Sequence, residues 1–219
     1  ENVVARLARE GFTAAIELPA GLLAAALLEC VLAWPNYLAY FNVFAGGSAN
    51  GYKHLVDSSL DWGQDLSALK TWLDEHQSIK NKPLYLAYFG TADPRWYEIE
   101  ARPLPENRFN RETTPAPLRE GIYCISATTL QCVYSAEIGP WCLPYEANYQ
   151  IALGRMRRYY QTDPNPSAPA HLVANEHDIP RIRNVSEFEN LRFSRLCAYL
   201  RQRKPVAQVG YSIFVFDLT

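Results

Sequence analysis

The stretch Leu84-Tyr-Leu-Ala-Tyr-Phe89 decides the fold of this chain, because it is a continuous apolar run that stops at Gly90. A short apolar run bounded by a turn residue is typical of a strand that is buried on both faces of a sheet. The run Ile122-Tyr-Cys-Ile125, directly after Gly121, has the same character. The sequence therefore predicts a sheet that contains these two strands.

Segments with helical spacing alternate with the predicted strands. Leucines at helical spacing predict a helix from Leu66 to about His76, and a further helix is expected over residues 145–160. Ser186 and Glu189 form a capping box, which predicts a helix that starts there and ends before Pro205.

The C-terminal residues complete the predicted sheet. Residues 206–209 and 212–218 are expected to form two strands around Gly210, either as a hairpin or as a single bent strand. Proline-rich surface loops are expected over residues 102–119 and 161–170. Because helices alternate with strands, the predicted fold class is α/β, a small mixed sheet with flanking helices.

A hydrophobic helix is predicted ahead of this sheet. Residues 12–34 have about the length that crossing a bilayer core requires, and Leu18–Leu28 carries no charge. Glu17 and Glu29 lie toward the ends, where a charge costs less than at the bilayer centre. We expect this helix to span a membrane, and a soluble core helix or a signal peptide are the alternatives.

Basic residues predict the orientation of this helix. Arg6 and Arg9 precede it, whereas Lys53 is the one Lys or Arg within about twenty residues after it, so the residues after Trp34 are expected on the extracytoplasmic, periplasmic side. The predicted organisation is a cytoplasmic-side flank (1–11), the hydrophobic helix (12–34), an aromatic and glycine-rich juxtamembrane segment with an acidic motif (35–65), and an extracytoplasmic α/β domain (66–219).

The acidic motif Asp57-Ser-Ser-Leu-Asp-Trp-Gly-Gln-Asp-Leu66 contains the first set of candidate site residues. If the motif is helical, Asp57, Asp61 and Asp65 share one face and repel one another unless a ligand or backbone amides satisfy them. Carboxylates and Gln64 beside the Trp62 indole suit a carbohydrate, because the ring stacks on a sugar while the polar groups bind its hydroxyls.

Two other interpretations of the acidic motif remain open. Asp61 and Gln64 fit a capping box, with Asp65 in the first helical turn, where the helix dipole favours negative charge. A divalent cation on the shared face of Asp57, Asp61 and Asp65 is the weaker interpretation, because the spacing is not that of a calcium loop.

Asp93 and Trp96 are the second set of candidates, because they follow the first predicted strand. In open α/β sheets ligands bind beyond the carboxyl ends of the strands. The alternative is that Asp93 caps a helix whose first residue is Pro94.

Three segments resemble a known family. Trp34-Pro-Asn-Tyr-Leu-Ala-Tyr-Phe-Asn42, then Ala45–Tyr52, then Leu55–Leu66 are similar to the C-terminal region of bacterial family-39 glycosyltransferases, relatives of the protein O-mannosyltransferases. Tyr85–Pro94 and Pro205–Phe216 extend the similarity. Ser59 stands where the family's pattern has Asn.

The resemblance implies a multi-span membrane enzyme that takes a sugar from a polyprenyl-phosphate donor on the outer side of the membrane. Its acidic catalytic residues lie in an early loop that has no counterpart in this sequence, so no catalytic residue is carried over. The chain, which begins with Glu1, then corresponds to the tail of such an enzyme and is expected to be inactive alone. Its expected partners are membrane lipid, a lipid-linked sugar or glycan acceptor, and an upstream transmembrane bundle.

Composition excludes some functions and leaves others open. A net charge of -2 with scattered basic residues is no footprint for nucleic acid, and the five cysteines form no zinc spacing with the histidines. No resident cofactor is predicted. The alternatives to a glycosyltransferase domain are a membrane-tethered carbohydrate-binding module and a purely structural domain that packs on a membrane bundle.

Overall fold

The protein is described by a computed structural model that covers residues 3–79, 81–104, 118–162 and 179–219. Within these residues the strands are β1 (Leu84–Ala87), β2 (Arg102–Pro103), β3 (Gly121–Ser126), β4 (Ala207–Val209) and β5 (Ile213–Leu218). The α-helices are α1 (Val3–Ala33), α2 (Ser48–Gly51), α3 (Leu66–Glu75), α4 (Ala127–Leu130), α5 (Leu143–Thr162) and α6 (Ile179–Leu200). Short 3-10 helices are η1 (Tyr37–Ala39), η2 (Val43–Ala45), η3 (Asp57–Ser59), η4 (Gln77–Ile79) and η5 (Pro94–Tyr97).

The strands form one mixed sheet in the order β2-β1-β3-β5-β4. Strand β1 lies parallel to β2 and β3, whereas β5 lies antiparallel to β3 and β4. The carboxyl ends of β1 and β3 therefore meet at one edge, beside the start of β5, where Ser126 pairs with Ile213. The predicted α/β class is confirmed at this level, and the predicted strands are present.

Alternating side chains of the strands fill two cores, one on each face of the sheet. Tyr85, Tyr123 and Phe214 lie in the core under α6, and the Tyr85 and Tyr123 rings stack with centroids 4.5 Å apart. Leu86 and Cys124 lie in the core under α3. Both faces of β1 and β3 are buried, as a continuous apolar run predicts.

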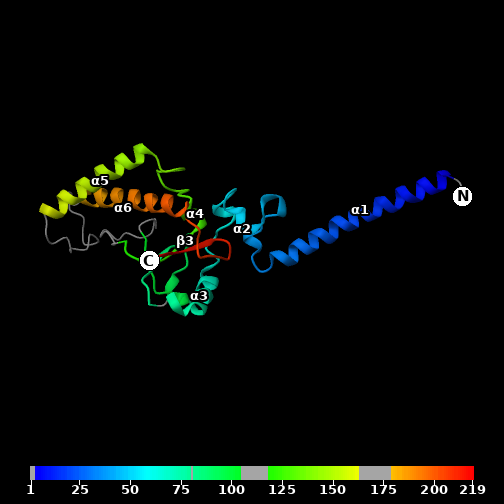
Figure 1. The fold of residues 1–219 in the computed structure, drawn as a ribbon, viewed down its shortest axis with the longest axis horizontal. Helices are drawn as coiled ribbons and strands as arrows, with labels where there is room; N and C mark the ends of the chain where they lie inside the picture. Colours follow the sequence, from blue (N-terminus) through cyan, green and yellow to red (C-terminus); the bar gives the residue numbers. More distant parts are fainter. Residues whose placement is uncertain (1–2, 80, 105–117, 163–178) are drawn as a thin grey trace.

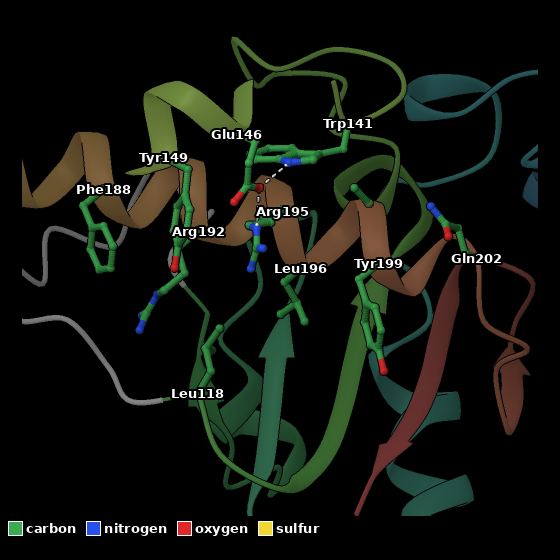
Figure 2. A pocket seen from close by; sticks show the side chains of 11 residues that line it. Leu118, Trp141, Glu146, Tyr149, Phe188, Arg192, Arg195, Leu196, Tyr199 and Gln202 are labelled. Carbon is green, nitrogen blue, oxygen red and sulfur yellow. Dashed lines mark hydrogen bonds and ion pairs between the residues drawn. The ribbon is translucent and has the colours of Figure 1, made fainter. Parts of the chain in front are cut away.

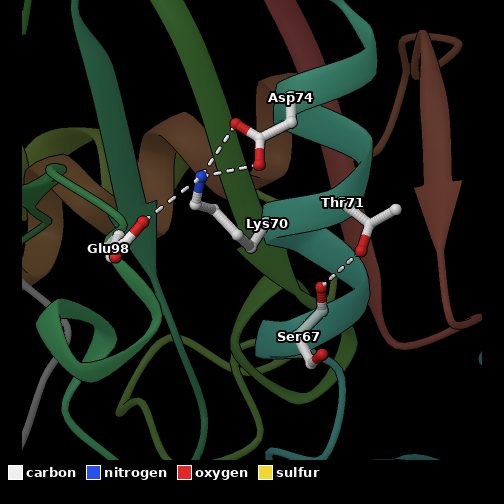
Figure 3. Close-up of polar contacts among 5 residues, drawn as sticks. All are labelled: Ser67, Lys70, Thr71, Asp74 and Glu98. Atoms are coloured by element: carbon white, nitrogen blue, oxygen red, sulfur yellow. Dashed lines mark hydrogen bonds and ion pairs between the residues drawn. The ribbon is translucent and has the colours of Figure 1, made fainter.

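Helices α3 and α6 lie on opposite sides of the sheet, and α5 packs on the outside of α6 (Figure 1). The apolar face of α3 buries Leu66 and Leu69, while its outer face is polar. Lys70 there bonds Asp74 at 2.6 Å and lies 4.0 Å from Glu98, which ties the helix to the residue after η5 (Figure 3). Thr71 donates to the Ser67 carbonyl at 3.1 Å on the same helix (Figure 3).

The helix that the Ser186 and Glu189 pattern predicted starts earlier than expected. Helix α6 begins at Ile179, so Ser186 lies inside it and caps nothing. Glu189 is buried and pairs with Arg192 one turn later. The capping-box prediction is wrong because the buried side chains Val185 and Phe188 continue the helical contact with α5 across that position.

The hairpin prediction at the C-terminus is correct. Strands β4 and β5 are antiparallel, and Gly210 and Tyr211 in their turn have positive φ values of 57° and 67°. The predicted loop over 102–119 contains β2 at its start, and its residues 105–117 lie outside the described residues. The same holds for residues 163–170 of the loop predicted over 161–170, while residues 161–162 belong to α5.

Helix α1 covers the predicted hydrophobic helix and projects away from the sheet (Figure 1). The leucines between positions 18 and 32 of this helix are exposed, among them Leu18, Leu23 and Leu27. Within the part of the chain whose side chains are described, no helix combines the length and the apolar character that crossing a bilayer requires. A helix is thus present where one was expected, and its passage through a membrane stays a prediction.

Candidate functional site

Residues 57–65, called here the acidic loop, lie at the sheet edge where β1 and β3 end. Asp57 at its start donates its backbone N–H to Thr128 Oγ1 at 2.9 Å, just beyond β3. Gly63 in its middle accepts from Tyr88 Oη at 2.5 Å, directly after β1. Asp65 at its end accepts from Ser212 Oγ at 2.6 Å, directly before β5. Three strand ends therefore hold the loop at the edge where ligands bind in open α/β sheets.

The acidic loop is not a helix, so the expected helical face of three carboxylates does not exist. A single 3-10 turn covers Asp57–Ser59, and α3 begins only at Leu66. Asp57 itself has a φ of 61°, a conformation that costs a non-glycine residue free energy. The three acids therefore have three different surroundings.

Asp61 is the buried acid at the centre of the loop. Its side chain is 1% exposed, and its Oδ1 accepts from the Gly63 backbone N–H at 3.1 Å. Its Oδ2 has no hydrogen-bond partner among the described residues. Burial raises the pKa of this carboxyl group to about 6, and the hydrogen bond from the Gly63 N–H acts in the opposite direction.

Asp61 thus closes a tight turn and does not cap α3, which corrects the capping interpretation. Its hydrogen bond to the N–H two residues ahead is the pattern of an Asx turn. The residue at the helix cap position is Asp65, yet its carboxylate makes no capping hydrogen bond. Asp61 is held by a local turn, whereas Asp65 bonds Ser212 from a distant part of the chain.

Asp65 is the second buried acid. Its Oδ2 accepts from Ser212 Oγ at 2.6 Å and from Gln64 Nε2 at 3.2 Å. Burial raises the pKa of the Asp65 carboxyl group, while the bonds from Ser212 and Gln64 act in the opposite direction. Gly210 makes room for this carboxylate, because a Cβ at Gly210 would lie 2.1 Å from the Asp65 Cγ.

Trp62 presents the exposed surface of the acidic loop. Its side chain is 63% exposed, yet Nε1 donates to the Ser58 carbonyl at 2.8 Å and so fixes the indole against the loop. Gln64 Oε1 accepts from the Trp62 backbone N–H at 2.8 Å, and its Nε2 bonds Leu60 O and Asp65. The polar atoms of Gln64 thus brace the loop, while the indole face stays open.

Asp57 completes the outward-facing groups together with Tyr134. Tyr134 Oη donates to Asp57 Oδ2 at 2.5 Å, and its ring stacks on Phe89 at 5.8 Å between centroids. Sequence reasoning missed Tyr134, which is separated from Asp57 by 77 positions and follows no motif. It also missed Ser212, although the neighbouring hairpin turn at Gly210 could have pointed to it.

The second set of candidates, Asp93 and Trp96, lies outside the acidic loop and has other hydrogen-bond partners. Asp93 accepts the Arg95 backbone N–H at 2.9 Å at the start of η5, with Pro94 in the first position, so the capping alternative is confirmed. The ion pair and hydrogen bonds with Arg95 lower the pKa of the Asp93 carboxyl group. Trp96 is 86% exposed. No hydrogen bond or ion pair between described residues joins either residue to the acidic loop.

Metal binding receives no support from the described side chains. Among them, no three His, Cys, Asp or Glu residues are grouped so that they could hold a metal ion. Asp61 and Asp65 have their own hydrogen-bond donors in Gly63 and Ser212.

A second concave surface lies between α5 and α6, and its volume is about 730 Å³ (Figure 2). Two of its charged groups, Glu146 and Arg195, are paired with each other, and Arg192 pairs with Glu189. Glu146 accepts from Arg195 Nε and from Trp141 Nε1, each at 2.8 Å, and these bonds together with one from Gln150 lower its pKa to about 2. The Arg195 guanidinium also covers the Tyr149 ring.

Comparisons of the chain with protein-family models, with curated proteins and with solved structures found no match. The functional assignment therefore depends on the chemistry of the acidic loop and on the motifs in the sequence.

Proposed function

We propose that this chain is the extracytoplasmic, C-terminal domain of a membrane glycosyltransferase that uses a polyprenyl-phosphate-linked sugar. The observation that carries this proposal is the exposed Trp62 indole, which bonds the carbonyl of Ser58, the residue after Asp57, in a loop held at the carboxyl ends of parallel strands. The resemblance of this motif to family-39 glycosyltransferases supports the same assignment.

The chemistry of the outward-facing groups suits a sugar. The indole offers an apolar face on which the C–H face of a pyranose stacks. Asp57 has one oxygen occupied by Tyr134, and among the described residues no hydrogen bond reaches the other, which can accept from a sugar hydroxyl. An aromatic platform and an adjacent acceptor are the elements of a carbohydrate subsite.

The candidate residues then divide into two groups. Trp62 and Asp57 contact the ligand. The other three, Asp61, Gln64 and Asp65, hold the loop in shape, because each makes a hydrogen bond within the protein and the two acids are buried. Bond cleavage is assigned to an upstream part of the enzyme, so this domain binds and orients a substrate.

The membrane assignment is supported by α1. Its exposed leucines form a continuous apolar surface, which in a folded protein marks an interaction site. Arg6 and Arg9 at its start and the single Lys53 after it favour an orientation with the α/β domain outside the cytoplasm.

Ligand binding by paired tryptophan variants tests the proposal. The chain is reconstituted in lipid nanodiscs and titrated with a polyprenyl-phosphate hexose. Trp62→Ala and Asp57→Asn are each expected to weaken binding roughly tenfold, the loss of about 1 to 2 kcal/mol that a stacked ring or a charged hydrogen bond contributes. Trp96→Ala is the matched control, because this indole is also exposed but follows η5.

Equal losses of affinity for Trp62→Ala and Trp96→Ala, or no loss for either, would contradict the assignment to the acidic loop.

A membrane-tethered carbohydrate-binding module is the second candidate function, and the exposed Trp62 indole is the observation that favours it. It predicts equal affinity for the free oligosaccharide and for the lipid-linked sugar. A glycosyltransferase domain predicts a preference for the lipid-linked form.

A further inference from the structure

Residues 34–56, called here the aromatic segment, join α1 to the acidic loop and have an unusual composition. They contain no Asp and no Glu, and their Lys and His residues are Lys53 and His54. The flanking residues Glu29 and Asp57 are acidic. The segment therefore lacks the negative charge that would repel an anionic surface.

Large apolar side chains of this segment are exposed together. Phe44 is 96% exposed, an extreme value for a phenylalanine in a folded protein. The others that are exposed are Trp34, Tyr37, Leu38, Tyr40, Val43 and Leu55. A cluster of this kind marks a surface that contacts an apolar partner.

Local hydrogen bonds fix Phe44 in its outward position. Asn42 Oδ1 accepts the Ala45 N–H at 3.0 Å and caps η2, which carries Val43 and Phe44. A His54 ring nitrogen lies 3.0 Å from the Ala45 carbonyl oxygen, so the C-terminal part of the segment folds back onto this turn. The exposure of Phe44 is thus a property of a defined turn.

Another phenylalanine of the segment, Phe41, points inward, unlike Phe44. Phe41 packs against the core, and a Cβ on Gly51 would lie 2.2 Å from its ring. The chain buries Phe41 and exposes Phe44 three residues later.

The aromatic segment is also continuous with α1. Tyr40 Oη donates to Glu29 Oε2 at 2.5 Å, across the turn that ends the helix. The exposed leucines Leu28 and Leu32 of α1 therefore adjoin the exposed cluster. Aromatic side chains beside an apolar helix are typical of the membrane-water interface.

We propose that the aromatic segment is a second membrane contact, in which Val43 and Phe44 insert into the lipid interface and Lys53 faces anionic headgroups. This inference rests on the proposed function in that α1 lies in the same bilayer. It goes further, because it also sets the distance of the acidic loop from the membrane, since that loop starts directly after residue 56. Trp62 and Asp57 are then held near the headgroups, where the sugar of a polyprenyl-phosphate donor is located.

Depth-dependent fluorescence quenching in vesicles tests this contact. The full chain, with the exposed Cys30 and Cys142 replaced by Ser, is labelled with bimane at Phe44→Cys and reconstituted into vesicles of phosphatidylcholine and phosphatidylglycerol. Nitroxide lipids then report the depth of the label. We expect the label about 5 to 10 Å below the headgroup boundary, the depth of an interfacial apolar face.

Two further labels make the outcomes distinct. Leu143→Cys is the matched control, since Leu143 is 86% exposed and lies at the start of α5, and it is expected to show at most about a third of the quenching at position 44. A label at Leu23→Cys reports whether α1 lies in the bilayer. Quenching at position 23 without quenching at position 44 would overturn the aromatic segment contact and leave the anchoring of α1 intact. Quenching at neither position would overturn both.

Discussion

At the residue scale, the buried Asp61 carboxyl group contributes to the pH dependence of the protein's stability. Its pKa is about 6 in the folded protein and 3.8 in an unfolded chain, with burial as the largest cause. The folded state therefore binds more protons between these values. The contribution to the free energy of unfolding is complete below about pH 4 and is lost as pH rises through about 6.

Asp61→Asn is expected to remove this dependence. The amide keeps an acceptor for the Gly63 N–H and carries no charge, so at pH 7 the variant is expected to be at least as stable as the wild type. The change in free energy of unfolding between pH 4 and pH 7 should differ by up to about 3 kcal/mol between variant and wild type. Urea unfolding at both pH values measures it, with the exposed Glu98→Gln as control. An unchanged pH dependence in Asp61→Asn would show that Asp61 is not buried in its charged form.

Gly63 provides the second residue-scale prediction. Its φ is 75°, and a Cβ there would lie 2.3 Å from Tyr88 Oη and 2.7 Å from the Phe89 carbonyl oxygen. Gly139→Ala is the matched control, because Gly139 has a φ of 86° and open space around it. We expect Gly63→Ala to be about 1 to 3 kcal/mol more destabilising than Gly139→Ala in thermal or urea unfolding. Equal losses would mean that backbone strain alone limits both sites and that the contact with Tyr88 is not tight.

At the scale of single elements, the sequence predicted strands β1, β3, β4 and β5 and missed β2, and its two capping boxes were wrong. Strands β1 and β3 follow from continuous apolar runs, because both of their faces are buried. The two capping boxes failed, since a capping pattern is local and distant side chains can override it. Ser212 binds Asp65 from 147 positions away, and no local pattern contains that information.

Ser186→Ala tests the revised start of α6. At a helix cap this change costs about 1 kcal/mol, whereas at an exposed position inside a helix it stabilises by up to about 0.5 kcal/mol. Because Ser186 is exposed and lies inside α6, we expect a small gain in the free energy of unfolding. Asp93→Ala, which removes an observed cap, is the matched comparison and should be destabilising. A loss in Ser186→Ala similar to that in Asp93→Ala would restore the capping box.

At the scale of the whole molecule, the sheet and its flanking helices hold the acidic loop at the carboxyl ends of β1 and β3. Helix α1 lies outside these layers. The composition and the order of the elements predicted the layers of the fold. The hydrogen bonds from Tyr134 and Tyr88 to the acidic loop join residues that are far apart in the sequence, so they exist only in the folded chain. Sequence therefore identified the acidic loop as a candidate and could not divide it into ligand-facing and bracing residues. That division follows from the burial of Asp61 and Asp65 beside the exposed Trp62.

Membrane retention of the chain is the prediction that belongs to α1. Leu23→Arg places a charge near the middle of its apolar run, which costs about 2.5 to 3.5 kcal/mol at a bilayer centre. We expect this variant to be released from vesicles by alkaline carbonate, whereas the wild type and Leu143→Arg stay bound. Release of Leu143→Arg to the same extent would mean that α1 is not the anchor.

The most direct test of the central claim is to locate where a lipid-linked sugar binds. The chain in nanodiscs is irradiated with a polyprenyl-phosphate hexose that carries a photoreactive group on the sugar, and the modified peptides are identified by mass spectrometry. We expect labelling within the acidic loop or at Tyr134, and we expect less of it in Trp62→Ala. Labelling confined to the groove between α5 and α6, or labelling that Trp62→Ala leaves unchanged, would contradict it.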